Sequence, residues 1–325
     1  YISFETPGSH GTGICIANSI LPKEMWLEER GVNAKWPVWG IMNTIHVDNA
    51  KEFRGNSLKN ACKQYGISLE FRPVGAPHWG GHIERLLGTF SKEIHNLPGT
   101  TFSNIQDRKN YKSEKNASFT LKEFEKWLTM YITNIYHNRE HSSIKESPIE
   151  RYKNGLMGNA NELGIGIPPR INNERRTRID FLPIVERTIQ EYGVVIDHIY
   201  YYDDVLRTFI HDEDKKNNKI KHIFKRDPRD ISKIYFYNTK LNDYFEIPYR
   251  NTSYPQITIW EHNHILKKLK KNKANVNEEL IFETYRELDE LEDKVIRETK
   301  KRKEKIQHTQ SIKYSCVQCE QTPFM

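Results

Sequence analysis

The sequence has few cysteines and no long apolar run. Its four cysteines, Cys15, Cys62, Cys316 and Cys319, are too few and too scattered for a disulfide-stabilised scaffold, so we expect a reducing, cytoplasmic environment. No stretch of about 18 apolar residues occurs, which argues against a membrane-spanning helix. Neither an initiator Met nor a signal-peptide pattern stands at Tyr1, and we therefore expect a fragment of a longer protein.

The chain is also short of hydrophobic residues, which make up 37% of its 325 positions. This low share predicts solvated helices or linkers beside the two or three domains that such a length allows. Lysine and arginine number 50 against 43 aspartates and glutamates, which leaves a formal charge of +7. A basic chain of this kind permits a polyanionic partner such as DNA without requiring one.

Residues 1–153 alternate strand and helix signals, which is typical of an α/β domain. A strand with alternating apolar side chains is predicted at 44–48, and a helix follows at 58–65. A second helix is predicted over 83–94 from its apolar spacing. The polar segment 100–119 interrupts the pattern and is expected to be an insertion.

Capping signals mark the ends of two predicted helices. Asn56 or Ser57 is available as the N-cap of the first, and Gly66 is placed to end it. Thr120 and Glu123 form the capping-box pattern before a further amphipathic helix.

The second half of the chain changes character. Residues 154–180 are rich in Gly, Asn, Pro and Arg and predict a basic linker at a domain boundary. Short aromatic-rich strands between 181 and 259 predict a small antiparallel β-barrel. Residues 260–310 are rich in Lys and Glu and predict a charged helical segment, and 311–325 predict a disordered tail.

Two carboxylates occupy positions that suit a metal site. Asp48 ends a predicted strand, and Glu84 lies in the first turn of a predicted helix. A strand, helix, strand and loop would bring that helix start back over the sheet. Mg²⁺ prefers such oxygen ligands, and two ions about 3.5–4 Å apart serve phosphoryl transfer. A turn after a strand and a dipole-stabilised helix start explain the same residues equally well, so spacing alone leaves both interpretations open.

The surroundings of Glu84 suit a nucleic-acid strand. Gly88, four residues on, leaves the surface beside the carboxylate open, and Gly80 allows close approach of a backbone. Arg85 and Lys92 lie on one adjoining stripe of the helix, where they would hold a phosphate backbone.

Other polar groups carry weaker signals. In the predicted linker, Arg175, Arg176 and Arg178 are expected to follow a DNA backbone. An aromatic and basic mixture in the predicted barrel suggests either DNA contact or an ordinary barrel: Tyr200, Tyr201, Tyr202, Lys221, Lys225, Arg226 and Arg229. Cys316 and Cys319, with or without His308, are half of a zinc site or incidental. His46, His78 and His82 flank the carboxylates and have either a phosphate-contacting or a purely structural role.

Several strings resemble one protein family in the right order. HVDNAKEF at 46–53 and GAPHWGGHIERLLGTF at 75–90 resemble the second and third catalytic boxes of DDE transposases and integrases, which have an RNase H-like core. YHNREHSSIKESPIERY at 136–152 is similar to the segment that closes that core. ILPKEMWLEERGVNAKWPVWG at 20–40 narrows the resemblance to the Mu-like branch, whose subunits work with an AAA+ ATPase. FKRDPRDISKIYFYN at 224–238 resembles the small barrel of that branch.

This resemblance assigns roles to particular residues. Asp48 would be the second metal-binding carboxylate and Glu84 the third, with Asn49 and Glu52 as support. Ala50 stands where the family usually has glycine, so the turn after Asp48 must avoid a strained backbone.

The first family carboxylate has no match in the chain. It belongs to the first strand of the core, and YISFETPG at the start of the chain looks like the second strand. Glu5 is the only nearby acid, and its context does not match. We therefore expect an RNase H-like core over 1–153 that lacks its first strand and is inactive by itself.

The resemblance implies a polynucleotidyl transferase. It would use Mg²⁺, or Mn²⁺ in its place, to cleave transposon ends and transfer strands, with DNA as partner and self-assembly on DNA. An AAA+ ATPase would bind the C-terminal segment, and the protein would be nucleoid-associated. Two alternatives stay open, namely a non-catalytic DNA-binding or assembly subunit derived from a truncated transposase, and a structure-specific nuclease on the same fold.

Overall fold

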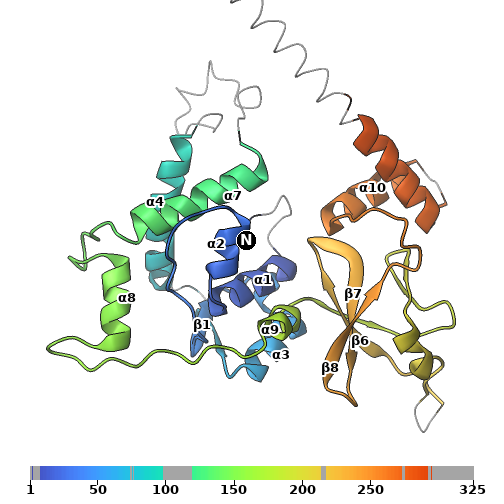
Figure 1. The fold of residues 1–325 in the computed structure, drawn as a ribbon, viewed down its shortest axis with the longest axis horizontal. Coiled ribbons are helices and arrows are strands. Elements are labelled where there is room, and N and C mark those ends of the chain that lie inside the picture. The colour runs from blue at the N-terminus through green and yellow to red at the C-terminus, as the bar shows by residue number, and fades with distance from the viewer. Residues whose placement is uncertain are drawn as a thin grey trace, which may run out of the picture. The chain divides into compact units, whose positions relative to one another are not determined.

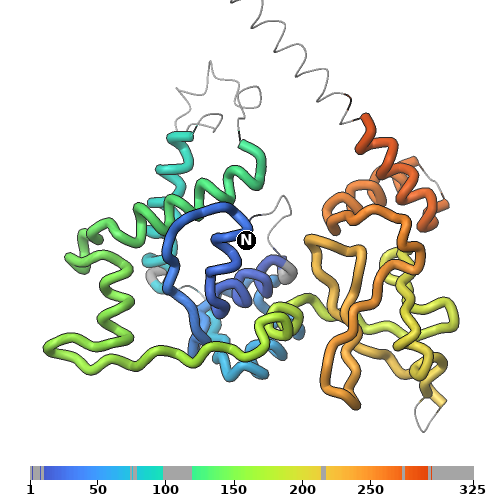
Figure 2. Tube along the Cα trace, viewed as in Figure 1, coloured from blue at the N-terminus to red at the C-terminus, as the bar shows by residue number. Residues whose placement is uncertain are grey.

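The chain folds into two compact units, Tyr1–Val185 and Glu186–Met325 (Figures 1 and 2). A computed structural model describes residues 2, 8–73, 75, 77–97, 119–213, 217–272, 275–291 and 294. Four predictions fall at least mostly outside these residues: the strand at YISFETPG, the insertion at 100–119, the tail at 311–325 and the zinc half-site. Within the described residues, no helix is both long and apolar enough to span a bilayer.

The first unit is mostly helical around one small sheet (Figure 1). Its elements up to the insertion are α1 (Ser9–Ile20), α2 (Glu24–Glu29), β1 (Thr44–Val47), η1 (Lys51–Phe53), α3 (Asn56–Gln64), β2 (Ser68–Phe71), η2 (Pro77–Gly80) and α4 (Gly81–His95). After it come α7 (Leu121–Met130), the π-helix η3 (Tyr131–Tyr136), α8 (Pro148–Met157) and α9 (Glu174–Asp180).

Strands β1 and β2 pair in parallel, in a register that sets Thr44 opposite Ser68 and Val47 opposite Phe71. Helix α3 forms the crossover between them, as parallel neighbours require. The strand and helix predicted at 44–48 and 58–65 are therefore confirmed. An RNase H-like identity for this α/β arrangement stays a prediction.

The core of the first unit lies between α1, α3 and the end of α9. Ile16 and Ile20 of α1 pack with Leu58 and Cys62 of α3 and with Phe181. Both helix pairs repeat at four residues, which places each pair on one helix face. Burial raises the pKa of the Cys62 thiol.

One predicted cap is confirmed and one is wrong. Thr120 and Glu123 form the complete capping box of α7. Helix α3 begins after Gly55, which makes no side-chain cap, so neither Asn56 nor Ser57 is the N-cap. Ser57 instead accepts a hydrogen bond from the Ile184 backbone N–H at 3.1 Å. Gly66 follows the end of α3 with φ 69°, a conformation that favours glycine.

The expected linker over 154–180 needs correction at both ends. Residues 154–157 belong to α8, and α9 is a helix with buried Thr177, Ile179 and Asp180 on one side. The two units divide at 185/186, beyond the predicted boundary. Charged residues at 174–178 concealed the apolar face of this short helix, because the side chains it buries pack against groups distant in the sequence.

The second unit has a four-stranded sheet of order β3-β6-β7-β8 and a separate hairpin, β4-β5. Its strands are β3 (Ile184–Arg187), which crosses the junction, β4 (Val194–Ile196), β5 (Ile199–Tyr201), β6 (His222–Asp227), β7 (Asp230–Asn238) and β8 (Asp243–Pro248). A short 3-10 helix, η4 (Asp204–Phe209), lies between β5 and β6. An isolated bridge between Tyr201 and Tyr249 links the hairpin to the end of β8. Closure of these strands into a barrel stays a prediction.

Helices follow the sheet, as the charged segment predicted. Helix α10 (Ile259–Lys271) begins at a Thr258 capping box, and a second helix runs over 278–291. Ile265 and Leu269 of α10 pack with Ile281 in a small cluster of their own. The charged side chains therefore cover the outside of a helix pair that has an apolar seam.

Candidate catalytic site

Asp48 lies just past the end of β1 and is exposed. Its Oδ1 accepts a hydrogen bond from the Ala50 backbone N–H at 3.0 Å, which forms a tight turn after the strand. Ala50 has φ −63°, an ordinary conformation for a residue with a side chain. The alanine at this position thus strains nothing, as the sequence required.

Asn49 joins the ends of the two parallel strands. Its Nδ2 donates to the Arg72 carbonyl at 2.9 Å, and its Oδ1 accepts from Arg54 Nη2 at 2.8 Å. The Arg72 N–H in turn donates to the Val47 carbonyl. Asn49 therefore has the contacts of a supporting residue. Glu52 lies half-buried in η1, away from these contacts.

Glu84 lies in the first turn of α4, where its carboxylate is exposed at the positive end of the helix dipole. A Cβ on Gly80 would lie 2.8 Å from Glu84 Oε1 and 2.5 Å from Arg72 Nη1. Glycine at position 80 is thus the condition under which the Arg72 guanidinium and the Glu84 carboxylate both approach this helix start.

Arg72 connects the two predicted carboxylates. Its backbone is hydrogen-bonded to the strand end that carries Asp48, and its side chain reaches the region of Glu84. The Arg72 Nε is buried and has no hydrogen-bond partner in the described part of the chain. Sequence reasoning missed Arg72, although it follows β2 at the same sheet edge at which Asp48 follows β1, because the carboxyl ends of parallel strands share an edge.

His46 and Trp79 border the same sheet edge. His46 Nδ1 lies 3.4 Å from Glu70 Oε2 on the neighbouring strand, and its ring centroid lies 6.5 Å from that of the exposed Trp79. His82 lies on α4, and the side chain of His78 is outside the described residues.

The donor set fits a hard cation incompletely. Asp48 and Glu84 offer exposed carboxylate oxygens, which are the ligands that Mg²⁺ prefers. Across the described ranges, no cluster of three or more His, Cys, Asp or Glu side chains is placed to bind a metal. The geometry therefore matches two members of a carboxylate triad.

The predicted DNA-binding cations divide into exposed and structural ones. Arg85 and Lys92 of α4 and Arg175 of α9 are exposed. Arg176 and Arg178 are half-buried in the first unit, where Arg176 Nε lies 3.7 Å from Asp180 and Arg178 donates to Asn18 at 3.3 Å. The last two therefore hold α9 in place in the first unit.

Burial corrects the prediction that Lys225 and Arg226 contact DNA, because each side chain is only 4% exposed. Arg226 Nη1 donates to Asp197 Oδ2 at 2.6 Å inside the second unit. Tyr201 is also buried and donates its hydroxyl hydrogen to the Ile231 carbonyl at 2.7 Å. This part of the aromatic and basic mixture thus belongs to the core.

A pocket of about 690 Å³ lies on another side of α4. Arg85 and Thr89 line it from α4, and Tyr136, Arg139 and Ile144 line it from the end of η3 and the loop before α8. Sequence reasoning missed this pocket because its two walls are separated by the insertion.

Known proteins match two parts of the chain. Residues 1–99 match the family described as the TnsB C-terminal domain, and residues 178–245 match the Mu transposase C-terminal family. A transposase for transposon Tn552 from Staphylococcus aureus is 27% identical over 153 residues, which cover 47% of this chain and 28% of that protein. Strings 46–53 and 75–90 lie in the first matched range, and most of 224–238 lies in the second. These matches support a transposase-related chain of the TnsB and Mu type.

Proposed function

We propose that this chain is the larger part of the catalytic region of a DDE-type DNA transposase, which cleaves transposon ends and transfers the strands to target DNA. One observation carries the proposal. Asp48 and Glu84, which resemble two of three family carboxylates, flank Arg72 at the carboxyl end of a parallel strand pair. The match of residues 1–99 to a transposase family supports it.

The residues of the chain prepare this site in different ways. The Ala50 N–H fixes Oδ1 of Asp48, which leaves the other oxygen for a cation, and Glu84 contributes a carboxylate from the neighbouring helix start. Mg²⁺ ions held by these oxygens would activate the attacking oxygen, first of water and then of a DNA 3′-hydroxyl, and stabilise the leaving oxygen. Arg72, Arg85 and Lys92 supply positive charge for the phosphate backbone.

The decisive test is strand transfer by the longest coding sequence that contains this chain. Glu84→Gln and Asp48→Asn each keep the size of the side chain and remove the charge that binds the cation. We expect each to lower the strand-transfer rate by more than about a hundredfold. Glu29→Gln, on the surface of α2, is the matched control and should leave the rate unchanged. Undiminished transfer by Glu84→Gln would refute the catalytic assignment.

A non-catalytic DNA-binding or assembly subunit is the second candidate. It is favoured by the observation that the described residues supply two carboxylates of a triad and not three. Such a subunit binds DNA in a salt-sensitive manner and shows no Mg²⁺-dependent cleavage in the assay above. In either case, self-assembly on DNA and binding of an AAA+ ATPase to the helices after residue 259 are further parts of the proposal.

A further inference from the structure

The pocket beside α4 has two walls of different origin. On α4, Arg85 and Thr89 are four residues apart and share the face that lines it. The opposite wall comes from the end of η3 and the following loop, with Tyr136, Arg139 and Ile144. Its volume of about 690 Å³ is within the range of sites that enclose a small organic ligand.

The chemistry of the walls suits a nucleotide. Arg85 and Arg139 bring a cation from each wall, and Tyr136 contributes an aromatic ring. The Tyr136 ring is packed against Phe90 of α4, with centroids 5.2 Å apart. Two carboxylates moderate the positive charge: Glu140 lines the pocket, and Glu93 lies 3.9 Å from Arg139.

Local structure holds the second wall in place before any ligand binds. A π-helix ends at Tyr136, and such helices are often found at functional sites. The loop that follows is closed by backbone hydrogen bonds from His141 to the Glu146 carbonyl at 3.0 Å and from Ile144 to the His141 carbonyl at 3.1 Å.

An open path leads from Glu84 to this pocket. Gly88 lies one turn after Glu84, and a Cβ built on it would meet no atom within 4 Å. Arg85 and Lys92 lie next along the helix surface, between Gly88 and the pocket face. A strand that crosses α4 at Gly88 therefore passes two exposed cations on its way from the carboxylate to the pocket.

We propose that the pocket receives one unpaired nucleotide of the DNA strand that crosses Glu84. Its base stacks on Tyr136, and its phosphate lies between Arg85 and Arg139. Aromatic rings combined with basic side chains are the usual means of binding single-stranded nucleic acid. A base within a duplex cannot enter such a pocket without leaving its stack. This inference rests on the proposed function, because it names how the same site treats its DNA.

The test compares three DNA probes against the whole chain: a paired duplex, the same duplex with one extra unpaired thymidine, and the same duplex with an abasic residue in place of that thymidine. We expect the unpaired thymidine to bind roughly tenfold more tightly than the abasic probe, as one stacked base allows. Tyr136→Ala and Arg139→Gln should remove this difference. Thr89→Phe, which fills the pocket from the helix surface, should do the same without touching the second wall.

A matched control separates a local effect from a general loss of charge. Arg151→Gln removes an exposed arginine on α8 that is ion-paired to Glu146 at 3.4 Å and does not line the pocket. It should keep the tenfold preference. Circular dichroism of each variant checks that the fold is intact.

The outcomes distinguish the two proposals. Equal affinity for the thymidine and abasic probes, or a preference that survives all three pocket variants, overturns the nucleotide pocket and leaves the proposed function standing. Failure of the whole chain to bind even the paired duplex at low salt would overturn both.

Discussion

Gly80 controls the approach of Arg72 and Glu84 more directly than any charged residue does. A methyl group there would lie 2.5 Å from Arg72 Nη1 and 2.8 Å from Glu84 Oε1, so both side-chain ends would have to move. Both are ends of flexible side chains, and the cost in folding free energy is therefore small. The functional cost is larger, because misplacement by about 1 Å at a reacting centre lowers rates steeply.

We therefore expect Gly80→Ala to change the melting temperature little and to lower strand transfer at least tenfold. The measurements are thermal unfolding and the strand-transfer assay on one preparation. Gly81→Ala is the control, because a Cβ at that position meets nothing within 4 Å. A variant at Gly80 with full activity would show that the approach of these two side chains is unimportant for the reaction.

His262 is the residue that should make the second unit acid-sensitive. It is fully buried and donates from Nε2 to the Asp197 carbonyl at 3.0 Å. Burial, then the nearby Arg226, lowers its pKa from 6.5 to about 4. Asp197 and the neighbouring His198 also face it, the first raising and the second lowering its pKa.

Because the folded pKa of His262 is depressed, the unfolded chain takes up the proton first as the pH falls. The free energy of unfolding should thus be unaffected by this group above pH 6.5 and decline between 6.5 and 4, by roughly 3 kcal/mol in all. Urea unfolding at a series of pH values measures it. His262→Gln should flatten the decline, whereas His264→Gln, at an exposed position, should not. An unchanged decline in His262→Gln would contradict this account.

Individual residue roles were predictable where the signal was local. Asp48 and its turn follow from a strand end, and the unstrained Ala50 follows from the same turn. The burial of Arg226 was not predictable, because its partner Asp197 lies on the other side of a long stretch of chain. A basic side chain gives no sequence signal that separates a phosphate ligand from a buried ion pair.

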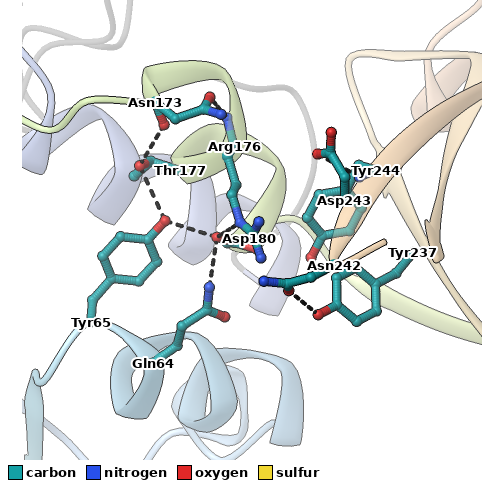
Figure 3. Close-up of polar contacts among 10 residues, drawn as sticks. All are labelled: Gln64, Tyr65, Asn173, Arg176, Thr177, Asp180, Tyr237, Asn242, Asp243 and Tyr244. Carbon is teal, nitrogen blue, oxygen red and sulfur yellow. Dashed lines mark hydrogen bonds and ion pairs between the residues drawn. The ribbon is translucent and has the colours of Figure 1, made fainter. Parts of the chain in front are cut away.

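At the scale of elements, α9 shows why composition misleads about linkers. Asp180 is buried and accepts hydrogen bonds from Gln64 Nε2 and Tyr65 Oη, each at 2.8 Å (Figure 3). Tyr65 also donates to Thr177 at 3.1 Å, and burial raises its pKa to about 12. These contacts fasten α9 to α3.

Asp180→Ala would leave two donors without their acceptor. We expect it to lower the free energy of unfolding of the first unit by about 2–4 kcal/mol, since each unsatisfied buried group costs about 1–3 kcal/mol. Denaturant unfolding measures this loss. Glu174→Ala removes a more exposed carboxylate of the same helix, paired to Arg170 at 3.0 Å, and should cost less than about 1 kcal/mol. Equal losses in the two variants would mean that 174–180 is held no more firmly than a linker.

Other elements were predictable for a physical reason. The strand at β1, the crossover helix α3 and the capping box of α7 depend on periodicity and on residues within four positions of each other. A short turn in the second unit is of the same kind: Tyr237 donates to Asn242 at 2.6 Å across the β7-β8 connection (Figure 3). Helix α9 depends instead on partners more than a hundred residues away, and no local pattern contains them.

At the scale of the whole molecule, each unit has its own role in the proposal. The first unit contains the carboxylates and the pocket, and the second contains a sheet, a hairpin and a helix pair. The two family matches fall one in each unit apart from a few residues at the junction. A function that needs DNA held while it is cut therefore has separate regions available for chemistry and for assembly.

The π-helix at Tyr131–Tyr136 has one more consequence. Its widened turn, in which the His137 N–H donates to the Ile132 carbonyl five residues back, is an α-helical turn with one extra residue. Deleting that residue would restore the tighter winding and rotate everything after it by about 100° around the helix axis. Tyr136 and Arg139 would then leave the pocket while α7 stayed as it is. The pocket wall thus exists by virtue of a single inserted position.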